Sequence, residues 1–145
     1  SFLSNGPGDP QDVKPVIQLV EELRGEYPIF GICLGHQMIC LACGAKTYKL
    51  KFGHRGGNHP VRDLEKERVF ITRQNHGYMV NGKGLPDNAE INCINVNDKT
   101  VEGIVYHGKP VFTVQFHPEA NAGPRDTAFL FDRFLKMAAE GRYDD

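Results

Sequence analysis

Residues 28–44, PIFGICLGHQMICLACG, carry the pattern that best indicates the fold of this 145-residue chain. The first five of these residues form a short apolar run, which is typical of a parallel strand buried on both faces. Cys33 follows this run directly, and residues 34–42 then have the pattern of a helix that ends at Gly44. A strand, an abrupt turn and a helix in this order predict an α/β protein whose turn carries a cysteine.

The glycines around Cys33 indicate that this turn is a nucleophile elbow. Gly31 and Gly35 stand two residues before and two residues after the cysteine, where a sharp strand-to-helix turn leaves no room for larger side chains. The free N–H groups and the positive dipole end at the start of the helix favour a thiolate, which is the reactive form of cysteine. The alternative is a buried, inert cysteine, which is the usual state of a free cysteine.

A second polar segment, Gln115-Phe116-His117-Pro118-Glu119, follows the apolar run at 111–114. Active sites of open α/β sheets lie at such strand ends. Residues two apart in an extended segment face the same way, so His117 and Glu119 can address one site. Glu119 would hold the tautomer that His117 needs as a base. A surface histidine beside a solvated carboxylate is the alternative for this pair.

The remaining sequence alternates helical and strand patterns. Apolar residues at helical spacing predict a helix over 13–23, which Gly25 ends. After Gly44, short strand-like runs separated by turns indicate hairpins as well as additions to the main sheet. These runs cover residues 46–51, 69–72, 91–96, 101–106 and 111–115. A last helix follows Gly123-Pro124, with an apolar stripe of Leu130, Phe131, Phe134, Leu135 and Ala138.

Composition places the chain among ordinary globular proteins. Hydrophobic residues make up 40% and charged residues 24% of the chain, and no repeat or low-complexity run divides it, so one domain over 1–145 is expected. The net charge of -1 gives no basic surface for nucleic acid, and no apolar run approaches the roughly 20 residues of a membrane span. The first residues lack the pattern of a secretory signal, which favours a cytoplasmic protein with free cysteines.

The first residues also carry an expectation about what precedes them. Phe2-Leu3 has the pattern of a strand end, whereas a doubly wound sheet starts with a complete strand and crossover helix. We therefore expect the domain to be truncated at its N-terminus, with further strands before residue 1. The turn-rich segment 4–10 follows, and its glycines let backbone N–H groups approach a ligand closely. The N–H groups of Gly6 and Leu34 could then form an oxyanion hole, although a rigid loop is the simpler interpretation of this segment alone.

Two cysteines and two histidines raise a zinc site as a rival hypothesis. Cys40 and Cys43 form a C-x2-C pair, and His54 and His59 follow as H-x4-H, near the spacing of zinc ligands. Zinc cysteines normally flank a tight turn, whereas Cys40 and Cys43 fall within a predicted apolar helix. We therefore expect core cysteines and no metal. His36 and His107 are also interpreted as structural.

The quoted motifs resemble a known family. GICLGHQ around Cys33 and QFHPE around His117 are similar to the two active-site motifs of class I glutamine amidotransferases, in the expected order. Three further segments, SNGPGDP, KFGHRGGNHPV and QNHGY, resemble the glutaminase domains that serve carbamoyl phosphate synthetases. The resemblance implies a flavodoxin-like α/β fold. This fold has a central, mostly parallel sheet flanked by helices, with added short antiparallel strands.

The resemblance also implies roles for individual residues. Cys33 would be the nucleophile, His117 the base and Glu119 the residue that orients it, with oxyanion donors at Gly6 and Leu34. Residues that match the glutamine-binding positions of the family are Gly6, Gly8, Leu34, Gln37, Asn75, Gly77 and Tyr78.

The implied reaction is hydrolysis of L-glutamine to glutamate and ammonia without metal or organic cofactor. The implied protein partners are a large carbamoyl phosphate synthetase subunit, which would bind ATP and bicarbonate, and an N-terminal domain of the same small subunit. Alternatives are an amidotransferase domain of a GMP or anthranilate synthetase, a cysteine peptidase, and a catalytically idle regulatory domain. The presence of both Cys33 and His117 argues against an idle domain.

Overall fold

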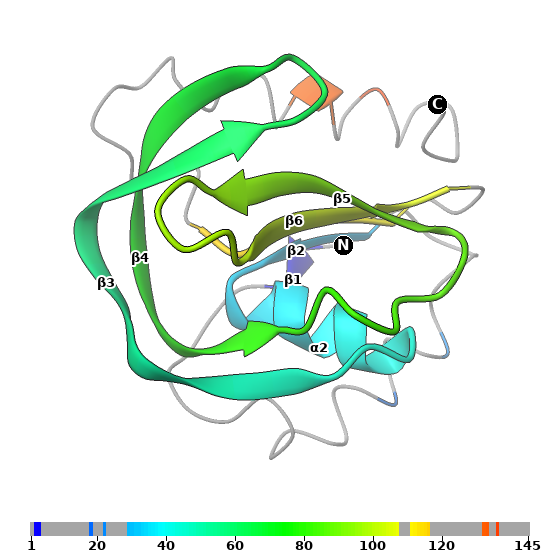
Figure 1. Ribbon diagram of the computed structural model, residues 1–145. Coiled ribbons are helices and arrows are strands. Elements are labelled where there is room, and N and C mark those ends of the chain that lie inside the picture. The colour runs from blue at the N-terminus through cyan, green and yellow to red at the C-terminus, as the bar shows by residue number, and fades with distance from the viewer. Residues whose placement is uncertain are drawn as a thin grey trace.

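The computed structural model describes residues 2–3, 18, 22, 29–107, 111–116, 132–133 and 136. Within these residues the chain forms one seven-stranded sheet in the order β1-β2-β7-β6-β5-β3-β4 (Figure 1). The strand bounds are, in chain order, β1 Phe2–Leu3, β2 Ile29–Ile32, β3 Thr47–Asp63, β4 Arg68–Val80, β5 Ala89–Asn95, β6 Val101–Tyr106 and β7 Val111–Val114.

The sheet is parallel at one end and antiparallel at the other. β1, β2 and β7 are parallel, and Ile29 of β2 stands opposite Val111 of β7. The other four pairings are antiparallel: β7 with β6, β6 with β5, β5 with β3, and β3 with β4. The helix α2, Leu34–Ala42, follows β2 and has the bounds that the sequence predicted. The mixed α/β class is therefore confirmed.

The antiparallel part is larger than the sequence indicated. Two of the six strand pairings in the described residues are parallel, so this part of the sheet is not mostly parallel. The predicted short runs at 46–51 and 69–72 belong to strands of 17 and 13 residues. Gly53 and Gly56 lie inside β3 with positive φ, and the pairing of β3 with β4 shifts register at two places. Gly53 lies within the first of these shifts, whereas Gly56 is paired with Gln74, and the strand continues through both. β3 and β4 thus form a long curved ribbon (Figure 1).

Two apolar clusters pack on the two faces of the sheet. Phe30 and Phe112 belong to one cluster, and their ring centroids are 5.2 Å apart. Ile29 and Val111 belong to the other cluster, together with Ile39 from α2. Burial on both faces accounts for the continuously apolar sequences of the two central parallel strands.

The two predicted terminal helices lie mostly outside the described residues. Gln18 and Glu22, within the first of them, are helical and exposed. Asp132, Arg133 and Lys136, within the second, are also helical. No helix in the described part of the chain is long and apolar enough to span a membrane.

Candidate active site

Cys33 occupies the turn between β2 and α2. Its backbone has φ 55° and ψ −110°, a left-handed conformation that non-glycine residues rarely adopt. The Cys33 N–H donates to the carbonyl oxygen of Val114 at 2.9 Å, which fixes the turn to the end of the neighbouring parallel strand. The predicted strand, sharp turn and helix are therefore confirmed. Backbone strain of this kind is concentrated at functional sites.

The glycines around the turn permit a very close approach between β2 and α2. A Cβ atom on Gly31 would lie 2.9 Å from both the carbonyl carbon and the oxygen of Gly35, and 2.4 Å from Cδ1 of Ile39. Real Cβ atoms essentially never come this close to their neighbours. The absence of a side chain at Gly31 is therefore what allows the helix to start directly above the strand.

A chain of hydrogen bonds connects β4 to the sulfur of Cys33. Gln37 Nε2, on α2, lies 2.6 Å from the carbonyl oxygen of Tyr78 and 2.7 Å from Oε1 of Gln115. Gln115 Nε2 in turn lies 3.5 Å from Sγ of Cys33. Gln115 and Gln37 are both buried. The structure thus brings Gln37 and Tyr78, two of the predicted glutamine-binding residues, into direct contact near the cysteine.

Gln115 was not among the residues predicted for the site. Two features of the sequence could have identified it: it is the first residue of the QFHPE motif, and it directly follows the apolar run at 111–114. A polar side chain at the end of a buried parallel strand is a candidate site residue.

Burial governs the ionisation of the cysteine. Removal from water raises the pKa of the Cys33 thiol to about 11, and the nearby Glu102 carboxylate acts in the same direction. The backbone N–H of Leu34 and the side chain of Gln115 lower the pKa, but by less than burial raises it. The helix-start donor that the sequence predicted is therefore present, yet it does not by itself make Cys33 a thiolate at neutral pH.

The structure describes some of the other predicted site residues but not all of them. Leu34 is half-buried at the start of α2. Asn75 is exposed, and Gly77 and Tyr78 are half-buried along the same strand, β4. Gly6, Gly8, His117 and Glu119 lie outside the described residues, so their roles stay predictions.

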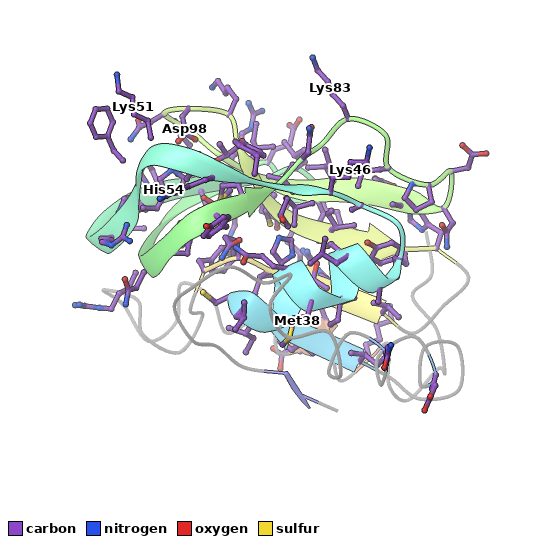
Figure 2. The ribbon with its side chains drawn as sticks, turned by 90° about the horizontal axis from the view of Figure 1, so that it is seen from below. Met38, Lys46, Lys51, His54, Lys83 and Asp98 are labelled. Atoms are coloured by element: carbon purple, nitrogen blue, oxygen red, sulfur yellow. The ribbon has the colours of Figure 1, made fainter. Side chains whose placement is uncertain are left out.

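A buried polar network lies under the β3–β4 ribbon. His54 Nδ1 and His76 Nε2 both contact Oε1 of Gln74, at 3.1 and 2.7 Å. Gln74 Nε2 donates to Oε2 of Glu102 at 3.0 Å. His54 Nε2 also pairs with Asp98 at 2.6 Å (Figure 2).

The described residues do not bring the four candidate zinc ligands together. Two of the proposed ligands have other contacts: His54 is part of the network, and Cys40 lies inside α2 with its sulfur 3.7 Å from Nδ1 of His36. Across the described ranges, no three His, Cys, Asp or Glu side chains are grouped closely enough to hold a metal ion.

The remaining histidines have structural contacts, as the sequence suggested. His36 is buried, with Nδ1 2.8 Å from the hydroxyl oxygen of Thr113. His107 lies 2.6 Å from a carboxylate oxygen of Glu90. Burial lowers the pKa values of His36 and His76 to about 3, and for each a neighbouring histidine adds to the effect. Both are therefore neutral at physiological pH.

Comparison with known proteins places the chain in a family. The model of the family "Glutamine amidotransferase class-I" matches residues 1–137. The chain is 57% identical over 141 residues to a carbamoyl phosphate synthase small chain from Archaeoglobus fulgidus, covering 97% of this chain and 39% of that protein. It is also 57% identical over 136 residues to the small chain from Methanocaldococcus jannaschii, covering 94% of this chain and 38% of that protein. The chain thus spans about two fifths of the length of these relatives.

Solved structures show the same fold. A protein described as part of a GMP synthase from Thermoplasma acidophilum has a TM-score of 0.77 and 26% identity, over 96% of this chain and 72% of that one. A glutamine amidotransferase from Thermotoga maritima has a TM-score of 0.69 and 25% identity, over 99% of this chain and 65% of that one. With a cysteine elbow between β2 and α2 and a family model that covers residues 1–137, this chain belongs to the class I glutamine amidotransferases.

Proposed function

We propose that this chain hydrolyses L-glutamine to glutamate and ammonia, with Cys33 as the nucleophile. The observation that carries the proposal is the backbone of Cys33, held with φ 55° between a buried strand and a helix start. This geometry places the sulfur close enough to the backbone N–H of Leu34 for that N–H to lower the pKa of the thiol. A nucleophile beside a backbone donor is the arrangement that acyl transfer requires.

The raised pKa of Cys33 makes a base necessary. With a thiol pKa of about 11, very little thiolate exists at pH 7, so attack on glutamine requires transfer of the thiol proton. His117 is the proposed acceptor, with Glu119 holding its imidazole in the required tautomer. We place both residues in the site because they belong to the QFHPE motif, which begins at Gln115 beside the Cys33 sulfur.

The reaction then proceeds in two steps. The Cys33 sulfur forms a bond to the side-chain carbonyl carbon of glutamine, and the N–H groups of Leu34 and Gly6 hold the negative oxygen. One such donor lowers the barrier by roughly 3 kcal/mol. Collapse of this intermediate breaks the C–N bond, and His117 gives its proton to the leaving ammonia. Water then attacks the thioester, His117 takes a proton from it, and glutamate leaves as the thiol re-forms.

The α-amino and α-carboxylate groups of the glutamine substrate would bind along β4 and α2. Gln37 and Tyr78 are already in contact at 2.6 Å, and Asn75 and Gly77 are close to Tyr78 along the strand. We propose that these four residues, with Gly8, bind the α-amino and α-carboxylate groups of glutamine or line the space that its side-chain amide occupies. No metal or organic cofactor takes part in this scheme.

The ammonia would be used by a synthetase partner. Relatives 57% identical to this chain are described as carbamoyl phosphate synthase small chains, whereas the structure described as part of a GMP synthase is 26% identical. We therefore propose a large carbamoyl phosphate synthetase subunit, which binds ATP and bicarbonate, as the partner, and a cytoplasmic location. The N-terminal domain of a small subunit is the second proposed partner.

Glutamate release measures the proposed activity directly. Cys33→Ser should abolish it while the variant stays folded, because a hydroxyl is a far weaker nucleophile than a thiolate. Cys43→Ser is the matched control, since Cys43 is a half-buried cysteine at the end of α2 and should keep the activity. Substantial glutamate release by folded Cys33→Ser would remove Cys33 from the mechanism.

A further inference from the structure

We propose that Gln115 is a positioning residue for the nucleophile: its amide N–H points at the Cys33 sulfur, and Gln37 fixes that orientation. The inference rests on the proposed function, in which Cys33 is the nucleophile. It adds a role for a residue that touches the sulfur and not the substrate.

The direction of the hydrogen bonds starts at a backbone carbonyl. The Tyr78 oxygen can only accept, so the Gln37 atom 2.6 Å from it is the NH2 group. The same NH2 group lies 2.7 Å from Gln115, whose facing atom must then be the amide oxygen. The other end of the Gln115 amide, 3.5 Å from the Cys33 sulfur, is therefore NH2 and donates. The orientation of this amide is set by a fixed acceptor on β4.

Three hydrogen bonds hold Gln115 in place, one each with Glu102, Gln37 and Cys33. Gln115 is 0% exposed, and its backbone N–H donates to the carbonyl oxygen of Glu102 at 2.7 Å. Gln37 is also anchored through its backbone, because its N–H donates to the carbonyl oxygen of Cys33 at 3.1 Å. Cys33, Gln37 and Gln115 thus form a closed ring of hydrogen bonds. A buried amide in such a ring can turn over only by breaking two of its bonds.

The direction of the bond determines its chemical effect. An N–H donor stabilises a thiolate more than a thiol, because hydrogen bonds to charged acceptors are roughly twice as strong as neutral ones. Burial and the Glu102 carboxylate oppose ionisation of Cys33, whereas the Gln115 amide and the Leu34 N–H favour it. Gln115 would therefore help His117 to generate the thiolate, and it would keep the sulfur aimed at the substrate.

Alkylation of Cys33 by iodoacetamide as a function of pH tests the inference without glutamine. Only the thiolate reacts, so the profile reports the pKa of the thiol. Cys33, Cys40 and Cys43 fall in the same tryptic peptide, 25–46, so tandem mass spectrometry must locate the label. The variants are Gln115→Met, which keeps the length of the side chain, and Gln115→Glu, which keeps its shape but replaces the donor with an acceptor. Thr113→Val is the control, because Thr113 is buried nearby and is not hydrogen-bonded to the sulfur.

We expect the profile of Gln115→Met to shift upward by about one pKa unit, so that alkylation at a fixed lower pH slows about tenfold. Gln115→Glu should shift it further, because an ionised carboxylate repels the thiolate. Gln37→Met should shift it in the same direction, since the Gln115 amide is then free to turn its oxygen toward the sulfur. Thr113→Val should leave it unchanged.

Several outcomes would overturn the inference. Profiles of Gln115→Met and Gln115→Glu that superimpose on the wild type would show that the amide does not act on the sulfur. An equal shift in Thr113→Val would show that general repacking, and not the donor, moves the pKa. If Gln115→Met does not fold, the comparison of Gln115→Glu and Gln37→Met with the wild type decides. Because no glutamine is used, a shifted profile in a chain without glutaminase activity would refute the proposed function alone.

Discussion

Adding one methyl group at Gly31 should disturb both the stability of the protein and its active site. In Gly31→Ala the new Cβ would lie 2.9 Å from the Gly35 carbonyl group, which is backbone and cannot rotate away. It would also lie 2.4 Å from Cδ1 of Ile39, whose side chain is 0% exposed. Either α2 moves away from β2, or the turn at Cys33 changes shape.

The size of the effect follows from the cost of overpacking. Forcing an extra methyl group into a packed core costs typically 1–3 kcal/mol, and a backbone contact places this case toward the upper end. For a domain of this size, about 2–3 kcal/mol lowers the melting temperature by roughly 5–10 °C. A displacement of the nucleophile by about 1 Å lowers the rate by roughly 100-fold. We therefore expect glutamate release to fall by more than the loss of folded protein explains.

Thermal unfolding and glutamate release at a temperature where all variants are folded test this expectation. Gly57→Ala is the matched control, because the nearest atom to its Cβ would be 3.5 Å away, at the end of the Arg73 side chain. Adding Ile39→Val to Gly31→Ala should recover part of the stability, since it removes Cδ1 but not the Gly35 contact. If Gly31→Ala has the melting temperature and the activity of the wild type, the close approach of β2 and α2 at Gly31 is not needed for the turn at Cys33.

Two further predictions concern proton transfer and buried charge. His117→Asn should slow glutamate release at pH 7 more than Glu119→Gln, since the first removes the proposed base and the second only its orientation; wild-type rates for both would contradict the triad. Burial raises the pKa of Glu102 to about 8, although Gln74 and Asn95 donate to its Oε2. The folded state therefore holds a proton that the unfolded state loses from about pH 4.5, which lowers stability as the pH rises toward 8. The buried neutral histidines His36 and His76 act in the opposite direction up to about pH 6.5, so urea denaturation should show wild-type stability falling between about pH 6.5 and 8. Glu102→Gln should flatten this decline, and an unchanged slope would show that another group causes it.

Local sequence predicted the elbow well. The apolar run at 28–32, the two flanking glycines and the helix over 34–42 all act within one strand, one turn and one helix. Their physical causes are burial, close approach and helical spacing, and these can be read from neighbouring residues. The bounds of α2 were therefore predicted correctly, and so was the sharp turn at Cys33 that the elbow requires.

Contacts between distant segments could not be predicted in the same way. The donor on the Cys33 sulfur comes from Gln115, 82 residues along the chain, and its orientation depends on Tyr78, on a third segment. The long β3 strand was missed because Gly53 and Gly56 are typical of turns, whereas pairing with β4 keeps them in a bulged strand. The high pKa of Cys33 was missed for the same reason, since burial is a property of the whole fold.

Nucleophilic catalysis by Cys33 can be tested by detecting its glutamyl thioester. The protein is mixed with glutamine, quenched in acid during turnover and digested, and tandem mass spectrometry then locates any glutamyl group within peptide 25–46. We expect a glutamyl group on Cys33 in the wild type and none in Cys33→Ser. Continued formation of glutamate with no glutamyl group on Cys33, or with one on another residue, would contradict nucleophilic catalysis by Cys33.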